Sequence, residues 1–102
     1  MTDMATHNTE VPFTPDWVSP PGDTILDLLE ERDWTQQQLA DRLGYTPKHV
    51  NQLIKAKVPL TEDAAVRLQN VLGASVGFWL TREAQYRERL AIAEAVQQQA
   101  AM

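Results

Sequence analysis

Hydrophobic side chains recur along most of the chain at intervals of three and four residues, the period of an α-helix with one buried side. Ile25, Leu28 and Leu29 begin the first such run, and Arg32 completes its register. The pattern predicts five helices, at about 23–33, 35–43, 46–55, 61–72 and 75–97. No segment alternates apolar and polar residues as a half-buried strand does. The predicted fold class is therefore all-α.

Capping residues support these boundaries. The predicted N-caps are Asp23 or Thr24, then Thr35, Thr46, Thr61 and Ser75. Gln38 follows Thr35 by three residues, which is the spacing of a capping box. Pro47 stands first in the third helix, where its missing amide costs nothing. Gly44 and Gly73 are placed to end the second and fourth helices.

The two ends of the chain have a different pattern. Residues 1–21 contain prolines 12, 15, 20 and 21 and no apolar period, so we expect an extended, partly disordered arm. Its large apolar residues are Val11, Phe13, Trp17 and Val18. They either pack back on the helices of the same chain or contact a partner. Residues 22–97 then form the domain, and the tail at 98–102 is expected to fray.

Length and composition fit one small domain without cofactor chemistry. The chain has 102 residues, of which 43% are hydrophobic, enough for a single core. It has no cysteine, and His7 and His49 are its two histidines. A thiolate nucleophile and a metal site rich in cysteine or histidine are therefore excluded, and we expect no catalytic residue, enzyme activity, metal or cofactor. No signal or membrane segment is recognisable, so we expect a cytoplasmic protein.

Charge is distributed unevenly along the sequence. The net charge is -5, yet residues 1–34 hold eight acids and one base, Arg32, for a net -7. Residues 35–60 carry Arg42, Lys48, Lys55 and Lys57 against Asp41, a net +3. A basic central segment in an acidic protein can bind DNA locally even though the sum argues against it.

The connection between the second and third predicted helices is that of a DNA-binding helix-turn-helix. It consists of Gly44-Tyr45-Thr46, a short turn containing glycine. Ala40 is small enough for a close crossing, Gly44 accepts positive φ, and Val50 faces the preceding helix. The predicted motif core is Leu39, Ala40, Leu43, Gly44, Val50 and Leu53. An ordinary helical hairpin is the alternative.

The segment Gln36-Gln37-Gln38-Leu39-Ala40-Asp41-Arg42-Leu43-Gly44, followed by a capped helix, resembles the phage-repressor-like Xre helix-turn-helix family. The flanking segments are similar to those of HigA antitoxins: Pro20 to Leu26, Leu60 to Leu68, Leu72-Gly73, Phe78-Trp79-Leu80 and Tyr86. The resemblance covers about residues 18–91. It implies an antitoxin of a type II toxin-antitoxin module, which represses its own operon and neutralises a ribonuclease toxin by binding it.

The exposed side of the third predicted helix carries the residues for reading DNA. The expected base contacts are Lys48, His49, Asn51 and Gln52, because lysine suits guanine, and asparagine or glutamine suits adenine. The expected phosphate contacts are Gln36, Thr46, Lys55 and Lys57, which lie at helix ends or just beyond. Each has a simpler alternative: Thr46 is first a cap, His49 packs against the turn, and Lys57 is a solvated loop charge.

A recognition helix that reads few bases usually works in a two-fold dimer on inverted half-sites. The long last helix has more apolar length than a small core needs, so we expect the dimer interface there. Its residues are Trp79, Tyr86, Leu90, Ile92 and Val96. For Trp79 and Tyr86 a place in the core is the alternative.

Four functions remain open at this stage. The first is the antitoxin, with an inverted-repeat operator and a small basic ribonuclease as partners and acidic residues 1–34 as a surface for that toxin. The second is a phage-type repressor without a toxin, and the third is the DNA-binding front part of a longer regulator. The fourth is an interaction module that has lost DNA binding, for which the net charge of -5 is the best support.

Overall fold

The computed structural model describes residue 15 and residues 17–101, and over these residues it contains helices and no strand. The helices are α2 (Pro21–Arg32), α3 (Gln36–Leu43), α4 (Pro47–Ile54), α5 (Glu62–Leu72) and α6 (Val76–Ala101). The predicted all-α class is confirmed, with five helices in the described part of the chain.

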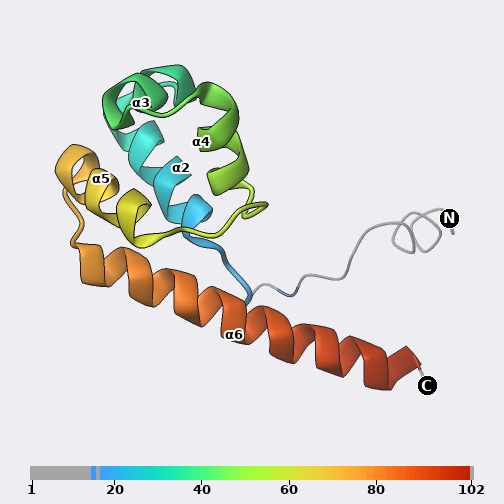
Figure 1. Ribbon diagram of the computed structural model, residues 1–102. Coiled ribbons are helices and arrows are strands. Elements are labelled where there is room, and N and C mark those ends of the chain that lie inside the picture. The colour runs from blue at the N-terminus through green and yellow to red at the C-terminus, as the bar shows by residue number, and fades with distance from the viewer. Residues whose placement is uncertain (1–14, 16, 102) are drawn as a thin grey trace, which may run out of the picture.

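Helices α2 to α5 form a cluster, and α6 runs along one side of it and continues well past it toward the C-terminus (Figure 1). The first part of α6 closes the core of this cluster. The largest fully buried side chains are Trp79, Ile25, Leu39, Leu68 and Val50, drawn from all five helices. Their burial is the main source of stability, at about 1.5–3 kcal/mol for each large apolar side chain.

The predicted caps are observed in four of the five helices. Thr35 and Gln38 form the complete capping box. The remaining caps, Thr46, Thr61 and Ser75, accept backbone amides of the first turn through their hydroxyls at 3.0–3.2 Å. Gly44 and Gly73 end α3 and α5 with φ of 78° and 96°, a left-handed conformation that glycine adopts without strain.

The predicted start of the first helix is wrong. Neither Asp23 nor Thr24 is the N-cap, because α2 begins at Pro21 with Pro20 as its cap. Proline at the first helical position has its φ already set and has no amide to leave unpaired. The helix therefore extends into the end of the segment predicted as an arm.

The predicted end of the last helix is also wrong. Helix α6 continues to Ala101, four residues past the predicted end at 97. The segment from Gln97 to Ala101 contains glutamine and alanine and no glycine or proline, and both residue types favour helix.

The backbones of α2 and α4 approach each other closely at Gly22. A Cβ added at Gly22 would fall well inside van der Waals contact with the carbonyl of Ile54, the last residue of α4. Glycine is thus required at this position for steric reasons, although its backbone is helical.

The chain before α2 is held against α6. The guanidinium of Arg82 donates to the carbonyls of Ser19 and Pro20 at 2.9 and 2.8 Å and to the hydroxyl of Thr24 at 3.1 Å. Val18 is buried, as expected if the apolar residues of this segment pack on the helices of the same chain. Trp17, in contrast, is 47% exposed. Val11 and Phe13 lie outside the described residues.

Candidate nucleic-acid interface

The steep crossing of α3 and α4 is built on a small apolar core. Leu39 and Ala40 of α3 and Val50 of α4 are at most 1% exposed, and Leu43 and Leu53 are nearly as buried. Gly44 takes the positive φ that the turn needs. The predicted motif core is thus assembled as expected, and the opposite side of α4 faces outward from it.

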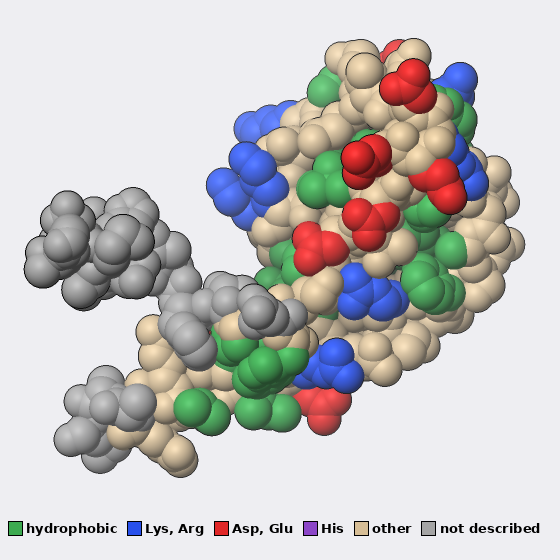
Figure 2. Space-filling model, turned by 180° about the vertical axis from the view of Figure 1, so that it is seen from behind, with side chains coloured by type: hydrophobic (Ala, Val, Ile, Leu, Met, Phe, Trp, Pro, Cys, Tyr) green, Lys and Arg blue, Asp and Glu red, His purple; other side chains and the backbone are tan. Residues whose placement is uncertain are grey.

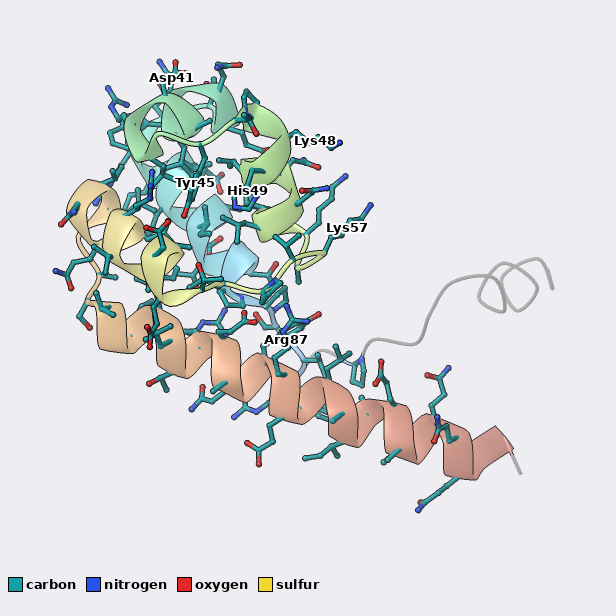
Figure 3. The ribbon with its side chains drawn as sticks, viewed as in Figure 1. Asp41, Tyr45, Lys48, His49, Lys57 and Arg87 are labelled. Carbon is teal, nitrogen blue, oxygen red and sulfur yellow. The ribbon has the colours of Figure 1, made fainter. Side chains whose placement is uncertain are left out.

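That outward side of α4 presents the residues predicted to contact bases. Lys48 and Lys55 are exposed, and Asn51 and Gln52 between them are half-buried. Lys48 and Lys57 point away from the body of the domain toward the same side (Figure 3). Two cations flanking two carboxamides can pair with acceptor and donor groups at base edges.

The residues predicted to contact phosphate surround this side. Gln36 is the first residue of α3, where the helix leaves backbone amides unpaired for an anion. Thr46 uses its hydroxyl as the cap of α4, the simpler of its two predicted roles, and Lys55 is the C-cap. Lys57 is exposed in the loop that follows. Ala56 precedes it with a φ of 59°, which turns the chain sharply after α4.

One contact joins the two helices at this surface. The side-chain amide of Asn51 donates to Oε1 of Gln36 across 3.4 Å. Both residues were predicted to contact DNA, one a base and one the backbone. Their contact was not predicted, because they are 15 residues apart and no short-range pattern links them.

His49 lies on a different side of α4 from Lys48. Its ring packs edge-to-face on Tyr45 with centroids 4.6 Å apart, and Figure 3 shows it turned toward that residue. This position supports the packing alternative for His49. Its role in base contact remains a prediction.

Three residues that the sequence analysis did not single out secure the turn between α3 and α4. The hydroxyl of Tyr45 donates to Oδ2 of Asp63 at 2.6 Å. Arg67 bonds the same carboxylate at 2.9 Å, donates to the carbonyl of Leu43 at 2.8 Å and lies over the Tyr45 ring at 4.6 Å. Asp63 and Arg67 have the i, i+4 spacing of a helical ion pair, which was visible in the sequence, but their link to Tyr45 was not.

This Tyr45–Asp63–Arg67 network changes the acidity of its members. Burial, together with the hydrogen bond to the Asp63 carboxylate, raises the pKa of Tyr45 to about 12. The hydrogen bond from Tyr45 in turn lowers the pKa of Asp63. At neutral pH the phenol is therefore protonated and the carboxylate charged, which is the state that the network requires.

A group of acidic side chains lies on another part of the domain. Helix α2 and its C-cap expose five of them: Asp23, Asp27, Glu30, Glu31 and Asp33. Seen from behind, acidic side chains gather over this face (Figure 2). The local +3 around α4 and the acidic α2 face are therefore spatially separated, as well as separated in the sequence.

The residues predicted for a dimer interface do not share one environment. Trp79 is 0% exposed, so its assignment to an interface is wrong. Its ring is buried in the core of its own chain. Tyr86 and Leu90 are half-buried. Ile92 and Val96 are 48% and 52% exposed on the part of α6 that passes the cluster.

The described residues contain neither a candidate metal site nor a candidate membrane-spanning helix. Residue 15 and residues 17–101 hold no group of three or more His, Cys, Asp and Glu side chains able to bind a metal ion. No helix in this part of the chain is both long enough and apolar enough to cross a membrane.

Comparison with known proteins agrees with this geometry. A helix-turn-helix family model matches residues 25–79. Over 60 residues the chain is 32% identical to YddM, an uncharacterised helix-turn-helix-type transcriptional regulator of Escherichia coli K12. That match covers 59% of this chain and 64% of the regulator, so the chain spans less than two thirds of that relative.

Two solved structures share the fold. A proposed antidote protein of a plasmid maintenance system from Nostoc punctiforme has a TM-score of 0.73 at 26% identity, over 82% of this chain and 94% of that one. The Pseudomonas aeruginosa antitoxin HigA, solved with the higBA promoter, has a TM-score of 0.72 at 26% identity, over 79% of this chain and 89% of that one. Since the family model matches more than half of the chain, the chain belongs to the Xre-type helix-turn-helix family of DNA-binding transcription regulators.

Proposed function

We propose that this protein is an antitoxin that binds its own operator with α4 and neutralises a ribonuclease toxin by direct contact. The observation that carries the DNA-binding part is the outward side of α4, where Lys48, Asn51, Gln52 and Lys55 stand together over a fully buried crossing. Because the crossing is packed, these side chains are held on a rigid support, as base reading requires.

The specificity residues in this proposal are Lys48, Asn51 and Gln52. Gln36, Thr46, Lys55 and Lys57 bind phosphates and set the position of α4 in the major groove. His49 is assigned to packing on Tyr45. Such a protein acts where the DNA is, in the cytoplasm.

A dimer gives the protein two recognition helices for an inverted repeat. The exposed apolar residues of α6, Ile92 and Val96, together with half-buried Tyr86 and Leu90, are the proposed interface. Their exposure supports this assignment, because apolar side chains of this size gain most from a second copy when the first chain leaves them in water.

The DNA-binding part is tested with the DNA immediately upstream of the gene. We expect Gln52→Ala and Lys48→Ala each to weaken binding about 5- to 100-fold, as loss of a base pairing does. Gln37→Ala, on the exposed surface of α3 outside the proposed contacts, is the matched control and should bind as the parent does. Equal binding by all four proteins would remove the proposed recognition surface.

The antitoxin part is supported by the structural likeness to HigA and by the acidic face of α2, which lies away from α4 and can meet a basic partner. Its test is co-expression with the product of the neighbouring open reading frame. Growth rescue with a co-purified complex is the expected result. A neighbour that is harmless and does not co-purify would leave a repressor of phage type.

A further inference from the structure

The start of α2 lies between two other helices, α6 and α4 (Figure 1). On the α6 side, the guanidinium of Arg82 donates to three oxygens at 2.8–3.1 Å: the carbonyls of Ser19 and Pro20 and the hydroxyl of Thr24. On the α4 side, Gly22 lies so close to the carbonyl of Ile54 that an added Cβ would collide with it. Helix α2 therefore connects Arg82 to the last residue of α4 through direct contacts.

The charge of Arg82 does not account for its place. A helix N-terminus carries a partial positive charge and favours anions, so a cation beside the start of α2 gains nothing from the helix dipole. The guanidinium instead offers geometry, because its N–H groups are fixed in one plane and can bond several acceptors at once. Arg82 thus holds the chain that enters α2, and the first turn of α2, against α6 as one unit.

The end of α4 that meets Gly22 carries two of the proposed phosphate contacts. Lys55 is the C-cap of α4, Lys57 follows in the next turn, and both side chains are exposed. Ala56 between them has a φ of 59°, and the amide of Lys57 donates back to the carbonyl of Gln52 at 2.9 Å. The two lysines are therefore fixed to the end of α4, and they move when it moves.

We propose that Arg82 is a positioning residue for DNA binding, which acts through α2 on Lys55 and Lys57. The inference rests on the proposed function, because α4 must enter the groove before these lysines can reach phosphates. Arg82 itself contacts no DNA. With Arg82 in place, α2 supports the end of α4 and holds both ammonium groups at the DNA backbone. Without it, the start of α2 separates from α6 and this support is lost.

The beginning of α4 has a separate support. Lys48 lies in the first turn, directly after the turn that the Tyr45–Asp63–Arg67 network holds against α5. These contacts do not involve Arg82. Loss of Arg82 should therefore weaken phosphate binding and leave the base preference unchanged, whereas general loosening of the domain would weaken both.

The experiment measures affinity for the DNA upstream of the gene at several salt concentrations, with the full chain and at a temperature where circular dichroism shows every variant folded. The logarithm of the binding constant falls with the logarithm of salt concentration, with a slope of about -0.9 for each phosphate contact. For Arg82→Ala we expect a slope less steep by about 0.9–1.8 for each bound chain, the value for one or two lost contacts, and roughly tenfold weaker binding at physiological salt. Selection from randomised duplexes should return the sequence that the parent selects.

A variant that lacks both lysines separates positioning from general weakening. Lys55→Ala combined with Lys57→Ala should make the slope less steep by about 1.8 for each bound chain. Adding Arg82→Ala to this variant should change the slope no further, because the contacts through which Arg82 acts are already absent. A further change as large as that in the parent background would overturn the proposal.

The matched control is Arg87→Ala, which removes the same charge from the same helix. Arg87 bonds Glu83 of α6 at 2.8 Å, and the Glu83 side chain is only 14% exposed. The control variant therefore loses stability as well as charge, because a largely buried carboxylate is left without its partner. Its salt slope should still equal that of the parent. An equal change of slope in the Arg82 and Arg87 variants would refute a positioning role.

Should Arg82→Ala not fold, Arg82→Gln takes its place. A glutamine carboxamide has two N–H groups for the three acceptor oxygens, so a less steep slope supports the proposal and the slope of the parent refutes it. If the parent protein itself does not bind the upstream DNA, the proposed function fails. That result differs from a parent that binds and an Arg82 variant that binds with the same slope, which overturns the inference alone.

Discussion

The pair α3–α4 and the distal half of α6 are both helical, but they are stabilised in different ways. The turn between α3 and α4 is braced by α5 through Tyr45, Asp63 and Arg67. The distal half of α6 leaves Ile92 and Val96 about half exposed. It remains helical because alanine, glutamine and glutamate favour helix, and its first half is anchored in the core by Trp79.

This difference indicates that one region fixes the orientation of α4, whereas the other is available for association with another chain. A recognition helix must keep its angle when it enters a groove, so packing and hydrogen bonds from neighbouring helices are useful there. An exposed apolar helix face has no such constraint and gains stability only when another surface covers it. Substitutions in the first region should therefore change the folding of the single chain, and substitutions in the second should change association.

The largest effect is expected where α2 meets the end of α4. In Gly22→Ala the new methyl group would collide with the carbonyl of Ile54, and the backbone there must move. We expect a loss of about 3 kcal/mol in the free energy of unfolding, measured by urea denaturation. Gly77→Ala is the control, since its nearest neighbour is Ser75 Oγ at 3.9 Å and helix propensity favours alanine. Similar unfolding midpoints for both variants would contradict the steric argument.

A smaller loss is expected when α6 is released from the chain before α2. Arg82→Ala removes the donors that satisfy the carbonyls of Ser19 and Pro20 and the hydroxyl of Thr24. We expect about 2 kcal/mol of destabilisation, measured by thermal unfolding. Arg89→Ala, at an exposed position on the same helix, should stay close to the parent. Equal melting temperatures for the two variants would show that the Arg82 contacts are not stabilising.

Removing one hydroxyl tests the brace of the turn. Tyr45→Phe breaks the hydrogen bond to Asp63 and should cost about 1 kcal/mol at neutral pH. Since the pKa of Tyr45 is raised to about 12 in the fold from 10.0, its contribution is present below pH 10 and is lost as pH rises toward 12. The difference between parent and variant should therefore shrink over this range. Urea unfolding at several pH values measures it, with Tyr86→Phe as the control, and a constant difference would contradict the assignment.

The smallest effect on folding is expected in the distal half of α6. Ile92→Ser and Val96→Ser should change the unfolding free energy of the single chain by less than about 0.5 kcal/mol, because both side chains are already about half exposed. Their effect should instead be on oligomeric state, measured by sedimentation equilibrium at micromolar concentration. A parent that sediments as a monomer would remove this surface as a dimer interface.

Most of the fold follows from local signals. Thr35 with Gln38, Thr46 before Pro47, and the glycines at 44 and 73 all mark helix ends through interactions within a few residues. The errors come from the same source: Asp23 and Thr24 are good caps, but Pro20 and Pro21 start α2 earlier. Helix α6 likewise continues beyond Gln97, because no capping or helix-breaking residue ends it there.

For the candidate site, sequence reasoning identified which residues stand on α4 but not what holds them. Helical periodicity separates buried Val50 and Leu53 from outward Lys48 and Gln52. It cannot show that His49 turns to Tyr45, because that contact depends on the path of the turn. Trp79 was ambiguous for a similar reason: an apolar residue on a long helix fits a core or an interface equally well until neighbouring helices are placed.

The sequence by itself determined the helices, the caps of α3 to α6, the glycine turn and the outward side of α4, since each depends on residues close together in the chain. Only the tertiary structure decided which side chains meet across helices: Gln36 with Asn51, Tyr45 with Asp63, Arg82 with Ser19 and Pro20. Such contacts join residues 15 to 63 positions apart, and their partners are chosen by how the helices pack around a shared apolar core. Local periodicity carries no information about that packing, which is why the side chains that position the recognition helix were found only in the fold.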